Sequence, residues 1–259
     1  MTPKGRHRPK RPAAQQPQEC PKRIVPLHGA RDVAPATARL TYRGGPLLTA
    51  VEVVTAFWGS AWSSAPNATT AQRLNEFFKF VVASDYVKQL AEYSTPEQTI
   101  GPGRFVTSAV LTDREPGATV SDGALQQMLE AHVASGALPA ATANTLYFTF
   151  LPPGVTVQAG SDQSCQVFCG YHDRSAGGLY YAVVPSPDCA GCLGGLAAFD
   201  AITSVSSHEL AEAITDPVPG QGWYDDANGE NADICAWQNK RLGDYEVQLL
   251  WSNRAAACV

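Results

Sequence analysis

Residues 206–217 read Ser-Ser-His-Glu-Leu-Ala-Glu-Ala-Ile-Thr-Asp-Pro. This segment indicates the fold more strongly than any other part of the sequence. On a helix, His208 and Glu212 are four residues apart, so their side chains leave the same face about one turn apart. That spacing lets both side chains bind one metal ion. Glu209 points about 100° away from His208, where it can hold a water molecule on the metal. This is the HExxH helix of metalloproteases with Glu in place of the second His, and it predicts a zincin-like fold.

The residues around this motif predict that its helix is buried. Asp200 can cap the helix, which should run to about Ile214 and end before Pro217. Charge is scarce along it, and its apolar positions are Ala201, Ile202, Val205, Leu210, Ala211, Ala213 and Ile214. Such a helix lies inside a protein, where His and Glu need partners. The alternative is a surface helix that carries an ordinary His and two solvated Glu.

Two ligands on a helix need a third, and several acidic residues follow the helix. They are Asp216, Asp225, Asp226, Glu230 and Asp233. Asp216 lies two turns beyond His208, about 12 Å along a straight axis, which favours a cap. Asp233 is the preferred third ligand and Glu230 the alternate, because both lie beside Cys235, which a disulfide would hold in place. Either acid could instead be a loop cap or a surface residue.

The predicted cofactor is one Zn²⁺ per chain, bound by His208, Glu212 and Asp233. Zinc would polarise a carbonyl and acidify its water, while Glu209 would take the proton and pass it to the leaving group. Two carboxylate ligands balance the charge of zinc and make the bound water less acidic. A harder ion such as Mn²⁺ or Ca²⁺ is therefore an alternative.

Two further side chains are candidates for catalysis. His172, in the sequence Cys-Gly-Tyr-His, could stabilise an oxyanion or compete to be the third ligand, and a structural His is an equal alternative. Tyr224 follows Trp223 and could donate a hydrogen bond to an oxyanion. Aromatic pairs of this kind more commonly anchor a loop.

The rest of the chain predicts a single α+β domain, with a mixed sheet packed on the motif helix. A chain of 259 residues that is 44% hydrophobic can build one sizeable core. Strands are predicted at residues 51–58, 105–111, 146–151, 179–184 and 245–251. Helices are predicted to begin at the capping residues Thr70, Ser121 and Asp200, the first continuing or restarting at Asp85. Long loops rich in Gly and Cys are predicted at 152–200 and 217–244.

Residues 1–40 are predicted to form a disordered basic tail and linker, followed by the folded domain at 41–259. Residues 1–23 carry a net charge of +6, which leaves -11 for the rest of a chain whose total is -5. A basic segment with little apolar content cannot repay the entropy of ordering. Binding of this tail to nucleic acid or an anionic surface is the alternative. No nucleic-acid partner is expected for the acidic folded domain.

The cysteines predict three disulfides, an oxidising compartment and a disulfide-stapled C-terminal half. Six of the seven lie in the last hundred residues, at Cys165, Cys169, Cys189, Cys192, Cys235 and Cys258. Cys20 is alone in the tail. Four of these thiols could instead bind a structural zinc. The chain has no apolar stretch long enough to span a membrane, and no signal-peptide-like apolar segment follows the basic residues at its N-terminus.

Several motifs occur in a fixed order between about residues 42 and 258. They are Tyr42-Arg-Gly-Gly-Pro-Leu-Leu48, Phe57-Trp58-Gly59, Cys165-x3-Cys169-Gly-x-His172, the Cys189/Cys192 pair, His208-Glu-Leu-Ala-Glu212, Trp223-Tyr224, Glu230-x-x-Asp233-Ile-Cys235 and Val247-Gln-Leu-Leu-Trp251-Ser252, ending at Cys258. In this order the chain resembles the EXORDIUM-like, or phosphate-induced, extracellular proteins of plants and their microbial relatives.

The resemblance implies an extracellular location, intramolecular disulfides and a zincin-like core, and it places the Glu230/Asp233 block beside the motif helix. It does not supply a reaction. The chain departs from the plant pattern in its shorter Cys189-x2-Cys192 spacing and in Thr215-Asp-Pro217, where the plant proteins tend to have Asn-Pro. It also lacks the signal peptide that the family leads us to expect.

Three functions follow from these observations. The first is a zinc metallopeptidase, a monomer acting on a peptide or protein substrate, with the strand at 179–184 pairing with an extended substrate. The second is an extracellular, cell-wall-type binding protein whose metal site is structural or lost. The third is a metal-dependent hydrolase of esters or other amides. A catalytic zinc keeps one coordination position open for water, whereas a structural zinc closes all four.

Overall fold

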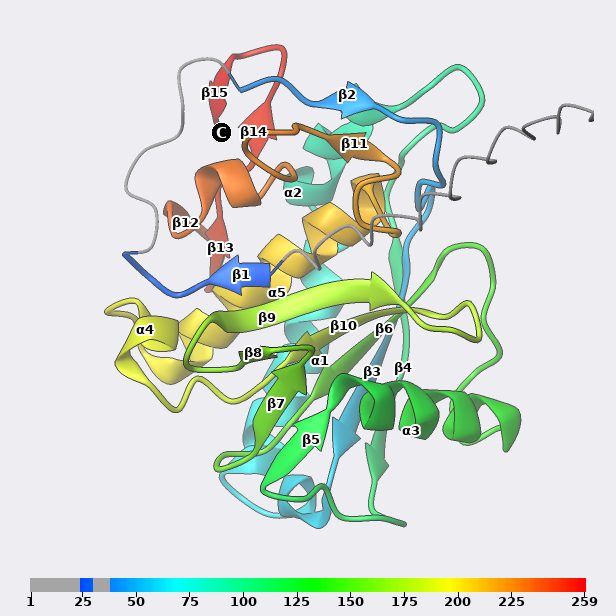
Figure 1. Ribbon diagram of the computed structural model, residues 1–259, viewed down its shortest axis with the longest axis vertical. Helices are drawn as coiled ribbons and strands as arrows, with labels where there is room; N and C mark the ends of the chain where they lie inside the picture. Colours follow the sequence, from blue (N-terminus) through cyan, green and yellow to red (C-terminus); the bar gives the residue numbers. More distant parts are fainter. Residues whose placement is uncertain (1–23, 30–37) are drawn as a thin grey trace, which may run out of the picture.

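The computed structural model describes residues 24–29 and 38–259, and its centre is a mixed sheet of six strands (Figure 1). In spatial order these strands are β1 (Ile24–Pro26), β9 (Phe168–Arg174), β10 (Tyr180–Val184), β6 (Thr145–Phe150), β3 (Glu52–Trp58) and β4 (Arg104–Leu111). The four strands from β10 to β4 are parallel, and β9 and β1 add antiparallel pairs at one side.

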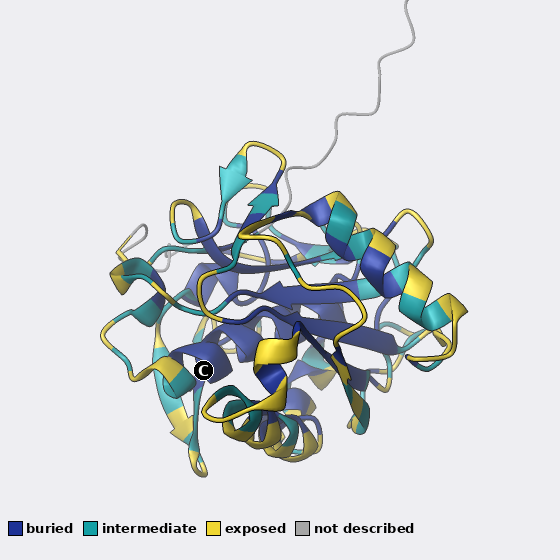
Figure 2. Cartoon of the chain, turned by 90° about the horizontal axis from the view of Figure 1, so that it is seen from below, coloured by how far each residue is buried: buried dark blue, intermediate teal, exposed yellow. Residues whose placement is uncertain are grey.

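The parallel strands β3, β6 and β10 are covered on both faces, which explains their β-branched and aromatic sequences, whereas the edge strand β4 is partly exposed. Side chains of β3 alternate between two cores, with Val53 and Phe57 on one face and Val54 and Trp58 on the other. Figure 2 shows the central strands in the dark blue of buried residues, while the outer helices carry exposed residues on their outward sides. The sheet is therefore the middle layer of a three-layer domain.

Helices α1 and α5 cover one face of the sheet and α3 covers the other. The α-helices of the described residues are α1 (Asn67–Val81), α2 (Asp85–Lys88), α3 (Asp122–Ala134), α4 (Ala190–Leu193) and α5 (Ala198–Thr215). Short 3₁₀ helices lie at Ser60–Ser63, Gln89–Tyr93 and Asp233–Cys235. The predicted α+β class, with a mixed sheet packed on the motif helix α5, is confirmed at this level.

Of the three predicted capping residues, one caps its helix and two do not. The Ser121 side chain accepts the N–H of Ala124 and caps α3, as predicted. Thr70 lies inside α1, which begins three residues earlier, and Asp200 lies in the first turn of α5. These two predicted caps are wrong. Both helices begin before the predicted residue, because packing on the sheet stabilises additional residues at their N-terminal ends.

Strand β9 fills part of a segment that the sequence predicts to be a loop. Its residues Gly170, His172 and Asp173 are poor strand formers, yet β9 pairs with β10 on one side and β1 on the other. Strand β10 is therefore internal, between β9 and β6. The prediction that residues 179–184 pair with a substrate is wrong, because both edges of that strand are already hydrogen-bonded.

The strand β1 also corrects the predicted tail. Residues 24–26, Ile-Val-Pro, belong to the sheet, and Val25 is fully buried opposite Gly170. Burial of this apolar triplet repays the entropy of ordering it. The remaining tail predictions, including that for Cys20, fall on residues 1–23 and 30–37, which lie outside the described residues.

Four smaller sheets complete the part of the domain that the structure describes. They are β2 (Thr41–Tyr42) with β11 (Trp223–Tyr224), β12 (Asn239–Leu242) with β13 (Tyr245–Gln248), β14 (Trp251–Ser252) with β15 (Ala257–Cys258), and β5 (Thr119–Ser121) with β7 (Thr156–Ala159) and β8 (Asp162–Gln163). The strand predicted at 245–251 is thus divided between β13 and β14.

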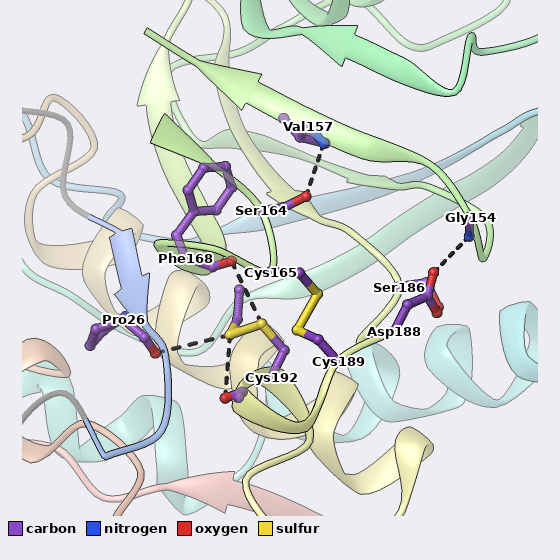
Figure 3. Close-up of a disulfide and its surroundings, with 12 residues drawn as sticks. Pro26, Gly154, Val157, Ser164, Cys165, Phe168, Ser186, Asp188, Cys189 and Cys192 are labelled. Atoms are coloured by element: carbon purple, nitrogen blue, oxygen red, sulfur yellow. Dashed lines mark hydrogen bonds between the residues drawn. A yellow bond between two sulfur atoms is a disulfide. The ribbon is translucent and has the colours of Figure 1, made fainter. Parts of the chain in front are cut away.

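Three disulfides staple the C-terminal half, as predicted. They join Cys165 to Cys189, Cys169 to Cys192, and Cys235 to Cys258. The first two lie side by side and tie the start of β9 to the segment around α4 (Figure 3). Because all six sulfurs are bonded in pairs, the alternative of a structural zinc held by these thiols is wrong. The disulfides are consistent with an oxidising location.

Candidate metal centre

The site is built on α5, which is buried along nearly its whole length. Every residue from Ala201 to Thr215 is buried, including His208, Glu209 and Glu212. The helix lies between β9 and β10 on one side and β13 on the other. Small residues such as Ala and Ser let these neighbours approach closely. The alternative of a surface helix is excluded, and the polar side chains of the motif need partners inside the protein.

The first potential ligand group joins α5 to the 3₁₀ helix that follows Glu230. His208 Nε2 lies 2.9 Å from Glu212 Oε1 and 3.9 Å from Asp233 Oδ1. The ligand atoms of these three residues all lie within 4.8 Å of one another. The structure therefore brings together the three residues that the sequence predicts as metal ligands.

Asp233 is held in place by contacts of both its backbone and its carboxylate. Its backbone N–H donates to Glu212 Oε1 at 3.0 Å, and its Oδ2 accepts the Glu230 N–H at 3.1 Å. Gly229, at φ 93°, passes so close that a Cβ there would overlap the Asp233 carboxylate. Two residues further on, Cys235 is bonded to Cys258. The predicted role of the disulfide in anchoring this loop is consistent with that arrangement.

The second ring nitrogen of His208 identifies a residue that sequence reasoning missed. His208 Nδ1 lies 3.1 Å from Gln248 Oε1. The same oxygen accepts the backbone N–H of Trp237 at 2.9 Å, so it is the amide oxygen that faces His208. Nδ1 must then donate, which leaves Nε2 unprotonated in the neutral ring. Metal-binding histidines show this arrangement, with one nitrogen on the metal and the other on an acceptor.

A second potential ligand group lies on the other side of Glu212. His172, on β9, places Nδ1 3.1 Å from Glu209 Oε2 and 3.6 Å from Glu212 Oε2. The ligand atoms of His172, Glu209 and Glu212 also lie within 4.8 Å of one another. His172 thus belongs to the same buried cluster as the motif helix.

Gly170 allows β9 to lie directly against α5. A Cβ at this position would meet Val205 Cγ1 at 2.6 Å and Glu209 Oε1 at 3.0 Å. Any larger residue would push the strand away from the helix. This glycine therefore lets His172, two residues along the same face of the strand, reach the carboxylates of α5.

Asp216 and Glu230 complete the cluster in different ways. Asp216 accepts the backbone N–H groups of Gly220, Gln221 and Gly222, so it organises the loop after α5, as the predicted cap. Its carbonyl oxygen lies 3.1 Å from His172 Nε2. Glu230 is fully buried, with Oε1 3.6 Å from His172 Nε2, and neither of its oxygens has a hydrogen-bond partner among the described residues.

Burial and neighbouring charges shift the pKa values of the ionisable groups in this cluster. Burial opposes charging of His208, yet the Glu212 carboxylate raises its pKa to about 10. Burial likewise opposes charging of His172, and the hydrogen bond and charge of Glu209 raise that pKa to about 9. Burial raises the pKa of Asp216 to about 6 despite its three N–H partners.

The glutamates differ in pKa because their neighbours differ. Burial would raise the pKa of Glu212, but the charge of His208 holds it below the usual value. Burial raises the pKa of Glu209, and the hydrogen bond from His172 offsets only part of the effect. Burial and the charge of Glu212 raise the pKa of Glu230 well above its ordinary range. The cluster therefore holds more carboxyl groups than its two imidazoles can pair with.

A metal ion fits these residues. Among the described residues, His208 Nε2, Glu209 Oε1, Glu212 Oε2 and both Glu230 oxygens are buried without a hydrogen-bond partner. Buried charges are normally paired or bound to a metal. Imidazole and carboxylate groups suit zinc and manganese. The cluster is a set of buried His and Glu groups that could hold a metal ion.

Tyr224 lies in β11, beside the acidic loop. Its backbone oxygen accepts a hydrogen bond from the Thr41 hydroxyl, and the Arg43 guanidinium carbon lies 4.5 Å from the centre of its ring. Its predicted role as an oxyanion donor stays a prediction.

No helix in the described part of the chain is both long enough and apolar enough to cross a membrane. Comparison with known proteins adds no relative. No protein-family model, curated protein or solved structure matches this chain.

Proposed function

We propose that residues 41–259 form a zincin-like, zinc-dependent hydrolase domain, and specifically a metallopeptidase acting on peptide or protein substrates. Zinc would be bound by His208, Glu212 and Asp233. The observation that supports this proposal is the geometry of His208. Its Nε2 has no hydrogen-bond partner among the described residues and faces two carboxylates, while its Nδ1 contacts Gln248. When bound, zinc polarises a carbonyl group and makes water nucleophilic near neutral pH.

Proton transfer would belong to Glu209. One of its oxygens contacts His172, and the other has no hydrogen-bond partner among the described residues. A carboxylate whose pKa is raised by burial is suited to take a proton from the attacking water and hand it to the leaving amine. His172 would hold Glu209 in one orientation, so we assign it a positioning role in this reaction.

A specific observation favours a second function, a non-catalytic protein with a structural metal. His208, Glu209, Glu212 and Glu230 are all 0% exposed, and Asp233 is 6% exposed. A hydrolase must admit its substrate to the metal, whereas a structural site is closed. The two functions therefore differ in whether substrate reaches the cluster.

The cellular setting is part of the same proposal. Three disulfides support an extracellular or secreted location, because such bonds persist in oxidising compartments. The order of motifs from Tyr42 to Cys258 supports membership of the EXORDIUM-like family. A monomeric state is proposed with it.

Metal content and turnover together test the proposal. The oxidised full-length protein would be analysed by plasma mass spectrometry and then incubated with a pool of unfolded proteins, whose new termini are identified by mass spectrometry. The variants are His208→Ala and Glu209→Gln. Their matched controls are His132→Ala, which removes a His that pairs with Asp113, and Glu76→Gln, which removes a half-exposed carboxylate paired with Lys79.

Zinc in the wild type, its loss in His208→Ala, and its retention without turnover in Glu209→Gln would support the metallopeptidase. Zinc binding without cleavage of any protein in the pool would favour the structural metal. A wild-type protein that binds no zinc even after dialysis against the ion would overturn both. Retained turnover in Glu209→Gln would remove Glu209 from its role.

A further inference from the structure

The Glu212 carboxylate lies between two imidazoles and presents a different oxygen to each. Oε1 lies 2.9 Å from His208 Nε2, and Oε2 lies 3.6 Å from His172 Nδ1. The two histidines come from different elements, α5 and β9, and each faces a different oxygen of this carboxylate. A carboxylate placed in this way can bridge two cations.

Both imidazoles are oriented by acceptors that cannot donate. Gln248 Oε1 faces His208 Nδ1, and the Asp216 carbonyl oxygen faces His172 Nε2. When it is neutral, as a metal ligand must be, each ring gives its N–H to that acceptor and turns its lone pair to the carboxylates. Either a proton or a metal ion can lie between each of these ring nitrogens and the carboxylate that faces it, and a metal ion suits the tautomer that the two acceptors favour. The arrangement occurs twice, once at each oxygen of Glu212.

The spacing around His172 matches that of metal ligands. Two atoms that are each about 2.1 Å from one tetrahedral metal ion lie about 3.4 Å apart. His172 Nδ1 lies 3.1 Å from Glu209 Oε2 and 3.6 Å from Glu212 Oε2, on either side of that value. In the first group, His208 Nε2 lies 2.9 Å from Glu212 Oε1 and 3.9 Å from Asp233 Oδ1, again one distance below and one above 3.4 Å.

The cluster holds more carboxylates than a single three-residue ligand group uses. Asp216 is satisfied by three backbone N–H groups, which leaves the carboxylates of Glu209, Glu212, Glu230 and Asp233. The two potential ligand groups together use three of these four, Glu209, Glu212 and Asp233, and Glu212 belongs to both groups. Glu230, whose two oxygens have no hydrogen-bond partner among the described residues, lies with Oε1 3.6 Å from His172 Nε2.

We propose that the cluster binds two divalent cations of the zinc or manganese type, with Glu212 as the bridging carboxylate. His208 and Asp233 complete the first site, and His172 and Glu209 complete the second. This inference deepens the proposed function, because pairs of metal ions are used by hydrolases to stabilise both the attacking and the leaving oxygen. It also changes one role: with the second site filled, Glu209 is a ligand, and Glu230 is the carboxylate left to accept a proton.

The number of bound ions tests the inference without any measurement of activity. The full-length oxidised protein would be stripped with a chelator, dialysed against Zn²⁺ or Mn²⁺, and analysed by plasma mass spectrometry. We expect two ions per chain in the wild type and in the control His132→Ala. We expect one in His172→Ala and one in His208→Ala.

Two further measurements guard against variants that fail to fold. Glu209→Gln preserves the shape of its side chain and should lower the stoichiometry from two to one. Electron paramagnetic resonance of the Mn²⁺-loaded wild type needs no variant, and should show two exchange-coupled ions. The spectrum of His172→Ala should be that of isolated Mn²⁺.

The outcomes separate this inference from the proposed function. One ion per chain in the wild type, lost in His208→Ala and kept in His172→Ala, would overturn the second site. His172 would then be the protonated partner of Glu209, and the single-zinc hydrolase would stand. No bound ion in the wild type would overturn both proposals.

Discussion

His208 Nδ1 lies 3.1 Å from Oε1 of Gln248, a residue forty positions further along the chain. Gln248 belongs to β13, which packs against α5, and its backbone N–H donates to Ser207 Oγ at 3.0 Å. This contact sets the direction of the His208 ring and leaves Nε2 for the metal. Through Gln248, the small β12–β13 sheet therefore supplies the hydrogen-bond acceptor that orients a proposed ligand.

We expect Gln248→Leu to weaken zinc binding by about 10- to 100-fold, because the ring loses the acceptor that holds it in one tautomer and orientation. Competition with a chromophoric chelator measures this. Gln248→Glu keeps an acceptor at the same place and should retain affinity, and Gln166→Leu, on an exposed turn, is the matched control. Equal affinities for Gln248→Leu and the wild type would show that the contact does not orient a ligand.

The close approach of Gly229 to Asp233 predicts a specific effect on the metal. Gly229→Ala introduces a side chain at φ 93° and a clash with the Asp233 carboxylate, so it should both destabilise the fold and weaken zinc binding. Gly136→Ala, at φ 78° with no atom within 4 Å of the added Cβ, isolates the backbone cost of about 1–2 kcal/mol. Denaturant titration and chelator competition on both variants separate the two effects. Unchanged zinc affinity in Gly229→Ala would remove Asp233 from the ligands.

The Cys235–Cys258 disulfide predicts a loss of stability coupled to a loss of metal affinity. Replacing both residues with Ala opens a loop with a sequence separation of 23 and should lower the free energy of unfolding by about 3 kcal/mol. Zinc affinity should also fall, because Asp233 lies beside Cys235. The double Ala variant of Cys165 and Cys189, with a separation of 24, should lose similar stability and keep its zinc affinity. An equal loss of zinc affinity in both variants would contradict this anchoring role.

Glu52 predicts a pH dependence of stability that is independent of the metal. Hydrogen bonds from Thr142 and Arg104 lower the pKa of Glu52 below 4.5, so its carboxylate favours the folded state. That contribution is complete above about pH 4.5 and disappears as the pH falls through the lowered pKa. The difference in unfolding free energy between wild type and Glu52→Gln should therefore shrink between pH 5 and pH 3. Urea titrations check this, with exposed Glu97→Gln as the control, and a constant difference would contradict it.

Local sequence was sufficient for the elements whose pattern and burial agree. The motif helix α5, the strands around Val53, Phe148 and Ala182, and the cap at Ser121 were all predictable from periodicity or capping chemistry. The three predicted ligands on and after that helix do lie together. The number of disulfides also followed from the cysteines, since six of them are crowded into the last hundred residues.

Tertiary structure decided the features that depend on distant partners. Strand β9 has a poor strand sequence and exists because β1 and β10 supply its hydrogen bonds, and with it come the positions of His172 and Gly170. The disulfide pairing, the contact of Gln248 with His208 and the burial of Glu230 likewise join segments far apart in the chain. The sequence by itself determined which side chains could bind a metal, because ligand chemistry and helical spacing are local. Only the tertiary structure decided that two imidazoles meet one carboxylate, since that requires a strand, a helix and a loop to pack around the same point.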